Sequence, residues 1–172
     1  SLYTGRNHLI TGVWGVPPRA NLLLDEKLMP QFLKTAGYST FLLGKRDCTQ
    51  PVGFEPWNAG WDNGFTVTGY QQKDPKTGTK NGPIFRTGFT SEIMSDEAVN
   101  YINSASDQPW FISLNYITPH MPWICSPEFA APYKAAGYSD NLANCWGAVT
   151  QMDAALGRVL NAIREKGLDQ NT

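Results

Sequence analysis

Two short apolar runs alternate with helical segments along this chain, and that alternation restricts the fold. Ser39 to Gly44 and Trp110 to Tyr116 are rich in aliphatic and aromatic residues and contain no charged side chain. Runs of this kind are typical of strands that are buried within a sheet. Because helical segments precede, separate and follow the two runs, we predict a layered α/β fold with parallel strands.

Two helices are predicted beside these strands. The first covers Leu28–Ala36 and stops at Gly37, a residue that suits a helix C-terminus. The second begins at Thr90 or Ser95, either of which can cap it, and runs to about Asn103.

The longest predicted helix covers Asn141–Lys166. Ser139 or Asp140 can cap its start, and Gly167 ends it. Its apolar residues recur at helical spacing, so we expect them to form the buried face. They are Leu142, Cys145, Trp146, Val149, Met152, Leu156, Val159, Leu160 and Ile163.

Residues 48–89 differ from the rest of the chain in composition. They are dense in Gly, Pro, Asn, Asp and aromatic residues, with turn signals such as Asp74-Pro75. We expect a long irregular insertion here, with room for a short hairpin, inside a single domain that spans residues 1–172.

Composition excludes several classes of function. The net charge of -1 provides no basic field for nucleic acid or for an acidic membrane surface. No apolar run approaches the ~20 residues of a membrane-spanning helix. Cys48, Cys125 and Cys145 are an odd set, so at least one thiol is unpaired within the chain, and no Cys/His cluster suggests a metal site.

Lys45 is the first candidate site residue. It follows the Ser39 to Gly44 strand directly, and ligands of parallel α/β sheets bind beyond the carboxyl ends of the strands. An ammonium group there can hold a sulfate or phosphate oxygen and stabilise developing charge. The alternative is a solvated lysine after a strand.

His120 is the second candidate. It follows the Trp110 to Tyr116 strand and lies between Pro119 and Pro122, which restrict the backbone. A rigid histidine beyond a strand end can bind a substrate oxygen or protonate a leaving group. The alternative is a loop histidine held by packing.

Four segments, in this order, resemble the type I sulfatases of the alkaline-phosphatase-like superfamily. Residues 3–6 (Tyr-Thr-Gly-Arg) match the tail of the first family signature, with Tyr3 in place of Leu. Residues 37–45 match the second signature through Lys45, residues 119–122 match a separate Pro-His-x-Pro segment of the family, and residues 149–172 resemble the long family helix. The resemblance implies an alkaline-phosphatase-like mixed, largely parallel sheet flanked by helices, incomplete in this chain.

The resemblance also implies the chemistry. A sulfatase of this type hydrolyses a sulfate ester with a formylglycine nucleophile and calcium. Lys45 would contact the sulfate and the nucleophile, and His120 would bind the sulfate or help to release the alcohol. The family nucleophile is expected before Ser1 and the last metal ligands after Thr172, so the resemblance implies that this chain alone is inactive and holds no metal.

The chain departs from the second signature at Arg46-Asp47, where the family commonly has Trp-His. Asp47 could act as a base only if its pKa were raised. A carboxylate near a sulfate also costs Coulomb energy. Asp47 is therefore kept as a candidate catalytic residue, with a solvated Asp paired to a nearby base as the alternative.

Aromatic residues in the 48–89 segment are candidates for substrate binding. Trp57 and Trp61 lie among glycines and polar residues, and such rings can stack on a sugar. The alternative is that they pack the segment down as a small core.

Three functions remain open at this point. The first is hydrolysis of a sulfate ester, carried by a sulfated small molecule or glycan. The second is hydrolysis of a phosphodiester or phosphonate, and the third is a non-catalytic, glycan-binding module. The resemblance hints at a periplasmic or secreted location, and exposed sheet edges predict self-association.

Overall fold

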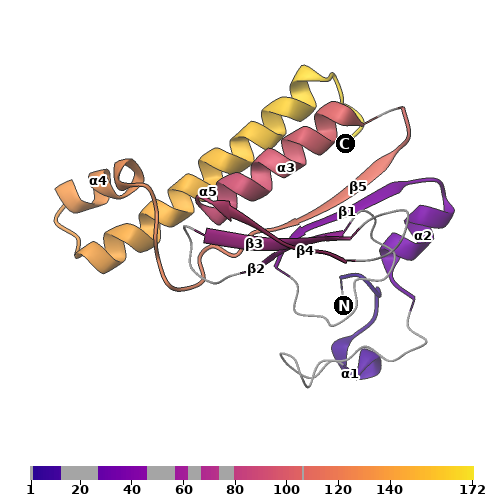
Figure 1. The fold of residues 1–172 in the computed structure, drawn as a ribbon, viewed down its shortest axis with the longest axis horizontal. Coiled ribbons are helices and arrows are strands. Elements are labelled where there is room, and N and C mark those ends of the chain that lie inside the picture. Colours follow the sequence, from indigo (N-terminus) through magenta and orange to yellow (C-terminus); the bar gives the residue numbers. More distant parts are fainter. Residues whose placement is uncertain (1, 13–26, 46–56, 62–66, 74–79, 106) are drawn as a thin grey trace.

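The computed structural model describes residues 2–12, 27–45, 57–61, 67–73, 80–105 and 107–172 (Figure 1). For the three strands between residues 57 and 87, it describes the backbone alone. The helices and strands are α1 (His8–Thr11), α2 (Met29–Thr35), β1 (Ser39–Gly44), β2 (Trp57–Trp61), β3 (Val67–Lys73), β4 (Lys80–Thr87), α3 (Thr90–Ser104), β5 (Trp110–Asn115), α4 (Pro127–Ala135) and α5 (Asp140–Glu165).

The strands form one mixed sheet in the order β4-β3-β2-β1-β5. β1 pairs in parallel with both β2 and β5, whereas β2, β3 and β4 are antiparallel to one another. The predicted α/β architecture is confirmed, and so are the two apolar strands and the three predicted helices, within one or two residues at each end.

The segment expected to be irregular contains three strands. The expected irregular structure was wrong for residues 57–61, 67–73 and 80–87, which extend the sheet as β2, β3 and β4. The expected hairpin agrees with the antiparallel pairing of β2 with β3 and of β3 with β4. The turn signals marked the breaks between strands only in part: Asp74-Pro75 falls between β3 and β4, whereas Asn81-Gly82-Pro83 lies within β4. They could not show that β2 pairs with β1, because that pairing joins segments separated in the chain.

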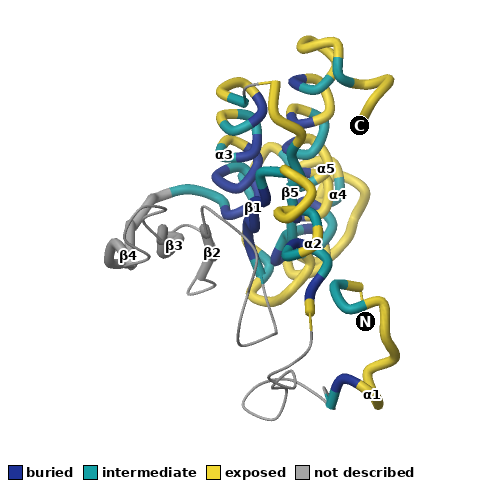
Figure 2. Tube along the Cα trace, turned by 90° about the vertical axis from the view of Figure 1, so that its right-hand side faces the viewer, coloured by how far each residue is buried: buried dark blue, intermediate teal, exposed yellow. Residues whose placement is uncertain are grey.

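The core lies where α3 and α5 cover one face of the sheet (Figure 1). Phe41 and Leu43 of β1 pack there against Ala98, Ile102 and residues of α5. Leu42 points to the opposite face, where Tyr3 and Phe111 pack against it. Because side chains alternate between the two faces of a strand, β1 contacts apolar residues on both faces. Every residue of β1 after Ser39 is therefore buried (Figure 2).

The buried face of α5 differs from the predicted apolar stripe. Leu142, Val149 and Leu160 are exposed, and Val159 is the member of the stripe that is fully buried. The face in contact with α3 and α4 is instead lined mainly by small residues, which let the helices approach closely. The buried residues are Ala143, Gly147, Ala148, Gln151, Ala155, Val159 and Ala162.

α4 was not predicted, although the sequence carries signals for it. Ser126 occupies the N-cap position and Pro127 the first turn, a pattern typical of a helix start. Gly137 follows the helix with a positive φ of 87°. α4 packs against α5, and the packing is tight at Gly147, where a Cβ would lie 2.7 Å from Cys125 Sγ and 2.9 Å from the Ala130 nitrogen.

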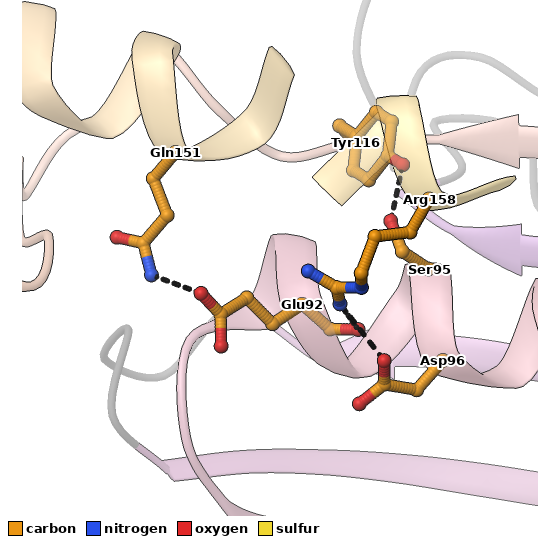
Figure 3. Close-up of polar contacts among 6 residues, drawn as sticks. All are labelled: Glu92, Ser95, Asp96, Tyr116, Gln151 and Arg158. Atoms are coloured by element: carbon orange, nitrogen blue, oxygen red, sulfur yellow. Dashed lines mark hydrogen bonds and ion pairs between the residues drawn. The ribbon is translucent and has the colours of Figure 1, made fainter. Parts of the chain in front are cut away.

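Polar side chains also join α3 to α5 (Figure 3). Arg158 forms an ion pair with Asp96 at 2.8 Å, and Gln151 donates a hydrogen bond to Glu92. Beside Arg158, the hydroxyl groups of Ser95 and Tyr116 lie 2.5 Å apart. None of the helices in the described part of the chain is long and apolar enough to cross a membrane.

Candidate functional site

The candidate site lies at the edge of the sheet where β1 and β5 end. The two strands run in parallel and in register, from the pair Ser39–Trp110 to the pair Gly44–Asn115. The chain segments that follow them, which carry Lys45 and His120, therefore leave the sheet at the same edge. Lys45 and His120 therefore follow two strands that are neighbours in the sheet, as expected.

Gly44 brings the two strand ends close together. Its φ of 94° lies in the left-handed region, and a Cβ at this position would clash with the carbonyl group of Asn115 and lie 2.9 Å from Met94 Sδ. Only glycine satisfies both conditions. This explains why glycine precedes Lys45, and it sets the direction in which the chain leaves β1.

The backbone of Lys45 is held on both sides by Asn115. The Lys45 N–H donates to the Asn115 carbonyl at 2.8 Å, and Asn115 Nδ2 donates to the Lys45 carbonyl at 3.1 Å. Lys45 itself is half-buried. Its backbone therefore has a defined position relative to the end of β5.

Tyr3 joins this arrangement from the beginning of the chain. Its hydroxyl group lies 2.5 Å from Ser113 Oγ and accepts a hydrogen bond from Asn115 Nδ2 at 3.3 Å. Ser113 Oγ in turn donates to Asn115 Oδ1 at 3.1 Å. Sequence reasoning missed Ser113 and Asn115 as site residues. The available signal was two polar residues at alternate positions of an otherwise apolar strand, which places them on one face.

His120 lies in the turn that follows β5. Its N–H donates to the Ile117 carbonyl at 2.9 Å, and its ring Nδ1 lies 2.6 Å from the carbonyl oxygen of Met121. Because a carbonyl oxygen can only accept, Nδ1 is the donor, and Nε2 is the unprotonated nitrogen of the neutral ring. The Trp123 indole N–H closes the turn on the Pro119 carbonyl at 2.9 Å. The imidazole is therefore oriented by its own loop and is exposed.

The remaining predicted residues are only partly within the described structure. Asp47 lies outside the described residues. Trp57 and Trp61 are the first and last residues of β2, and the structure describes their backbone but not their side chains. Trp57 is paired with Leu42, so β2 continues past the end of β1 on the side where Lys45 lies.

Two further observations limit the site. Within the described ranges, no group of three or more His, Cys, Asp or Glu residues could hold a metal ion. A cavity of about 540 Å³ opens near the other edge of the sheet, with Tyr38, Trp110 and Lys166 in its lining. It lies near the beginnings of β1 and β5, and its lining contains none of the predicted site residues.

Comparison with known proteins places this arrangement in context. A family model described as Sulfatase matches residues 1–172. The chain is 26% identical over 110 residues to an N-acetylglucosamine-6-O-sulfatase of Bacteroides thetaiotaomicron, with 60% of this chain and 18% of the relative covered. It is 25% identical over 171 residues to the N-acetylgalactosamine-6-sulfatase of Mus musculus, with 86% of this chain and 31% of the relative covered.

A solved structure shows the same fold. A Bacteroides thetaiotaomicron protein, studied in connection with the metabolism of multiple glycosaminoglycans, superposes with a TM-score of 0.82 at 19% identity. The superposition covers 99% of this chain and 46% of that protein. The chain thus spans less than half the length of the proteins it matches.

Proposed function

The chain belongs to the sulfatase family, and from this premise we propose that it forms part of an enzyme that hydrolyses the sulfate ester of a carbohydrate. Both curated relatives are named for the removal of sulfate from an N-acetylated amino sugar. The observation that carries the proposal is the register of β1 with β5, since it brings the segments bearing Lys45 and His120 to one edge of the sheet.

Lys45 is proposed to bind the sulfate group. An ammonium group offers three donors and a full positive charge to the sulfate oxygens, whose negative charge is redistributed as the S–O bond to the alcohol breaks. The half-buried position of Lys45 supports this role, because reduced solvation strengthens its interaction with an anion.

His120 is proposed to act on the leaving alcohol or on a sulfate oxygen through Nε2. The hydrogen bond from Nδ1 to the Met121 carbonyl can be kept in the imidazolium form of the ring. Only that form carries a proton on Nε2 while keeping this bond. The protonated ring can then donate this proton to the alcohol oxygen as the ester is cleaved.

The family's calcium and formylglycine are part of the proposal for the complete enzyme only. The described residues contain no cluster of metal-binding side chains, so they do not fit a calcium site. No step is therefore assigned to either group here. Trp57 and Trp61 also remain proposals as sugar-binding residues, supported by the course of β2 past the end of β1. Asp47 remains a proposal as a catalytic residue from its position two residues after Lys45 in the sequence.

Turnover of matched esters by the full-length protein tests the proposal. We expect hydrolysis of a 6-O-sulfated N-acetylhexosamine, and little or none of the corresponding phosphate ester. We expect Lys45→Ala and His120→Ala each to lower kcat/KM at least about 100-fold, as for other transition-state contacts. Lys134→Ala is the control, because the Lys134 ammonium group forms an exposed ion pair with Asp140 and neither residue is a candidate site residue.

Two results would count against the proposal, and a third would count against the expected inactivity of this chain. Faster hydrolysis of the phosphate ester would favour the phosphodiester or phosphonate alternative. Saturable glycan binding without turnover would favour a binding module. Turnover by the 172-residue chain alone would contradict the expectation that this chain is inactive.

A further inference from the structure

Tyr3, Ser113 and Asn115 form a closed ring of hydrogen bonds directly beside Lys45. The three links are Tyr3 hydroxyl to Ser113 Oγ at 2.5 Å, Ser113 Oγ to Asn115 Oδ1 at 3.1 Å, and Asn115 Nδ2 to the Tyr3 hydroxyl at 3.3 Å. Tyr3 is 110 residues away from Ser113 in sequence, so the ring ties the start of the chain to the end of β5.

The direction of each hydrogen bond in the ring follows from the atoms involved. The amide oxygen of Asn115 can only accept, so the Ser113 hydroxyl must donate its single proton to it. The Tyr3 hydroxyl must therefore donate to Ser113 Oγ, and its oxygen accepts one Asn115 amide proton. The second Asn115 amide proton is then directed to the Lys45 carbonyl, at 3.1 Å.

The ring thereby determines the orientation of the Asn115 amide. If the Tyr3 hydroxyl is removed, one amide proton and the Ser113 oxygen each lose a partner, and the amide can rotate away from Lys45. The Lys45 carbonyl then loses this donor, whereas the Lys45 N–H keeps its hydrogen bond to the Asn115 carbonyl.

We propose that this ring is a positioning device for Lys45, with Tyr3 and Asn115 as positioning residues that set where the Lys45 ammonium group meets the sulfate. The inference rests on the proposed function, because it assigns Lys45 to sulfate binding. Tyr3 and Asn115 act through the Lys45 backbone and need not touch the substrate. Small displacements of a charged group are costly in a site where geometry determines the rate.

A purely structural role is the competing explanation. Tyr3 also packs against Leu42, so it could simply fasten the start of the chain to the sheet. Tyr3→Phe separates the two roles, because the ring keeps its apolar contacts and loses only the hydroxyl. Tyr133→Phe is a matched control: it removes a hydroxyl group that lies 2.7 Å from Thr150 Oγ1, between α4 and α5.

The decisive experiment is a double-mutant cycle on the full-length protein, with a sulfated N-acetylhexosamine as substrate. We expect Tyr3→Phe to lower kcat/KM about tenfold in the presence of Lys45 and to cause no further loss in a Lys45→Ala background. Tyr133→Phe should leave kcat/KM unchanged, both in the presence of Lys45 and in the Lys45→Ala background. Effects of Tyr3→Phe and Lys45→Ala that simply multiply would overturn the inference.

Amide hydrogen exchange provides a second readout that needs no turnover. We expect the Lys45 N–H to exchange about tenfold faster in Tyr3→Phe than in the wild type, with no such change in Tyr133→Phe. Unchanged exchange at Lys45 would overturn the inference. Should Tyr3→Phe fail to fold, Ser113→Ala opens the same ring and is tested in its place.

The two readouts separate this inference from the proposed function. A wild-type protein that hydrolyses no sulfate ester refutes the proposed function, and the positioning of Lys45 is then decided by the exchange measurement alone. A wild-type protein that is active, with unchanged exchange at Lys45 in Tyr3→Phe, refutes the inference and leaves the proposed function intact.

Discussion

Gln151 of α5 donates a hydrogen bond from Nε2 to Glu92 Oε1 of α3 at 2.7 Å (Figure 3). The Gln151 side chain is only 2% exposed, and its Oε1 accepts from the Ser126 N–H at the start of α4 at 2.9 Å. One buried amide therefore connects three helices. The Ser126 N–H at the N-cap of α4 has no partner within its own helix, and the Gln151 amide provides one.

Replacement of this amide should destabilise the protein. We expect Gln151→Ala to lower the free energy of unfolding by about 2 kcal/mol, because it leaves the Ser126 N–H and a Glu92 oxygen without their buried partner. Urea denaturation measures the change. Gln170→Ala, at an exposed site near the end of the chain, is the control and should change the free energy by less than about 0.5 kcal/mol.

Two glycines of α5 should respond to alanine with opposite signs. We expect Gly147→Ala to destabilise the protein by about 1–3 kcal/mol, because its Cβ would lie 2.7 Å from Cys125 Sγ and 2.9 Å from a backbone nitrogen of α4. Gly157 has nothing within 4 Å of a Cβ, so Gly157→Ala should stabilise the helix by about 0.5–1 kcal/mol. Thermal unfolding of both variants tests the pair, and equal effects would contradict the packing described for α4.

Burial of Tyr116 should make stability depend on alkaline pH. Desolvation raises the pKa of Tyr116 above its ordinary value of 10.0, although the hydrogen bond with Ser95 and the charge of Arg158 oppose the shift. A raised pKa in the folded state means that the folded protein holds this proton more tightly than the unfolded chain. The stabilisation is complete below the ordinary pKa and is lost as the pH rises through the folded one.

Tyr116→Phe tests this dependence. At neutral pH we expect the variant to be less stable by about 1 kcal/mol, since the buried Ser95 hydroxyl loses its partner. As the pH rises above 10.0, the wild type should lose stability and the difference between the two proteins should shrink. Urea denaturation at neutral and alkaline pH measures this, and a constant difference would contradict the shift.

The exposed residues of α5 predict self-association. Leu142, Val149 and Leu160 are separated by seven and eleven residues, so they lie in one line along the helix at 3.6 residues per turn. We expect the 172-residue chain to associate through this line and Leu142→Gln with Leu160→Gln to weaken the association. Light scattering that shows the unaltered chain to be a monodisperse monomer would contradict the prediction.

Local pattern was sufficient for the elements around the candidate site. The apolar runs that became β1 and β5 need no distant information to be recognised as strands, because both are short and rich in aliphatic and aromatic residues, and every residue of β1 after Ser39 is buried. Lys45 and His120 follow those strands directly, so the topology of a parallel sheet was enough to predict that both lie at one edge.

Local pattern was insufficient wherever the partner of a residue lies far away in the chain. The spacing of apolar residues identified α5 as a helix, but its neighbours decided which face is buried. Because α3 and α4 each pack closely against α5, the buried face of α5 carries mainly alanine and glycine, and Leu142 and Leu160 are exposed. The same reason applies to β2, whose place beside β1 depends on a pairing between separate segments.

The sequence by itself therefore determined the α/β class, the order of β1, β5 and the three predicted helices, and the two side chains that follow β1 and β5, because these depend on local periodicity and chain direction. Only the tertiary structure decided that the Tyr3 hydroxyl meets Ser113 and Asn115 and that Asn115 holds Lys45. A hydrogen bond between residues 110 positions apart leaves no periodic signal in the sequence. It exists because the folded sheet brings those two positions together.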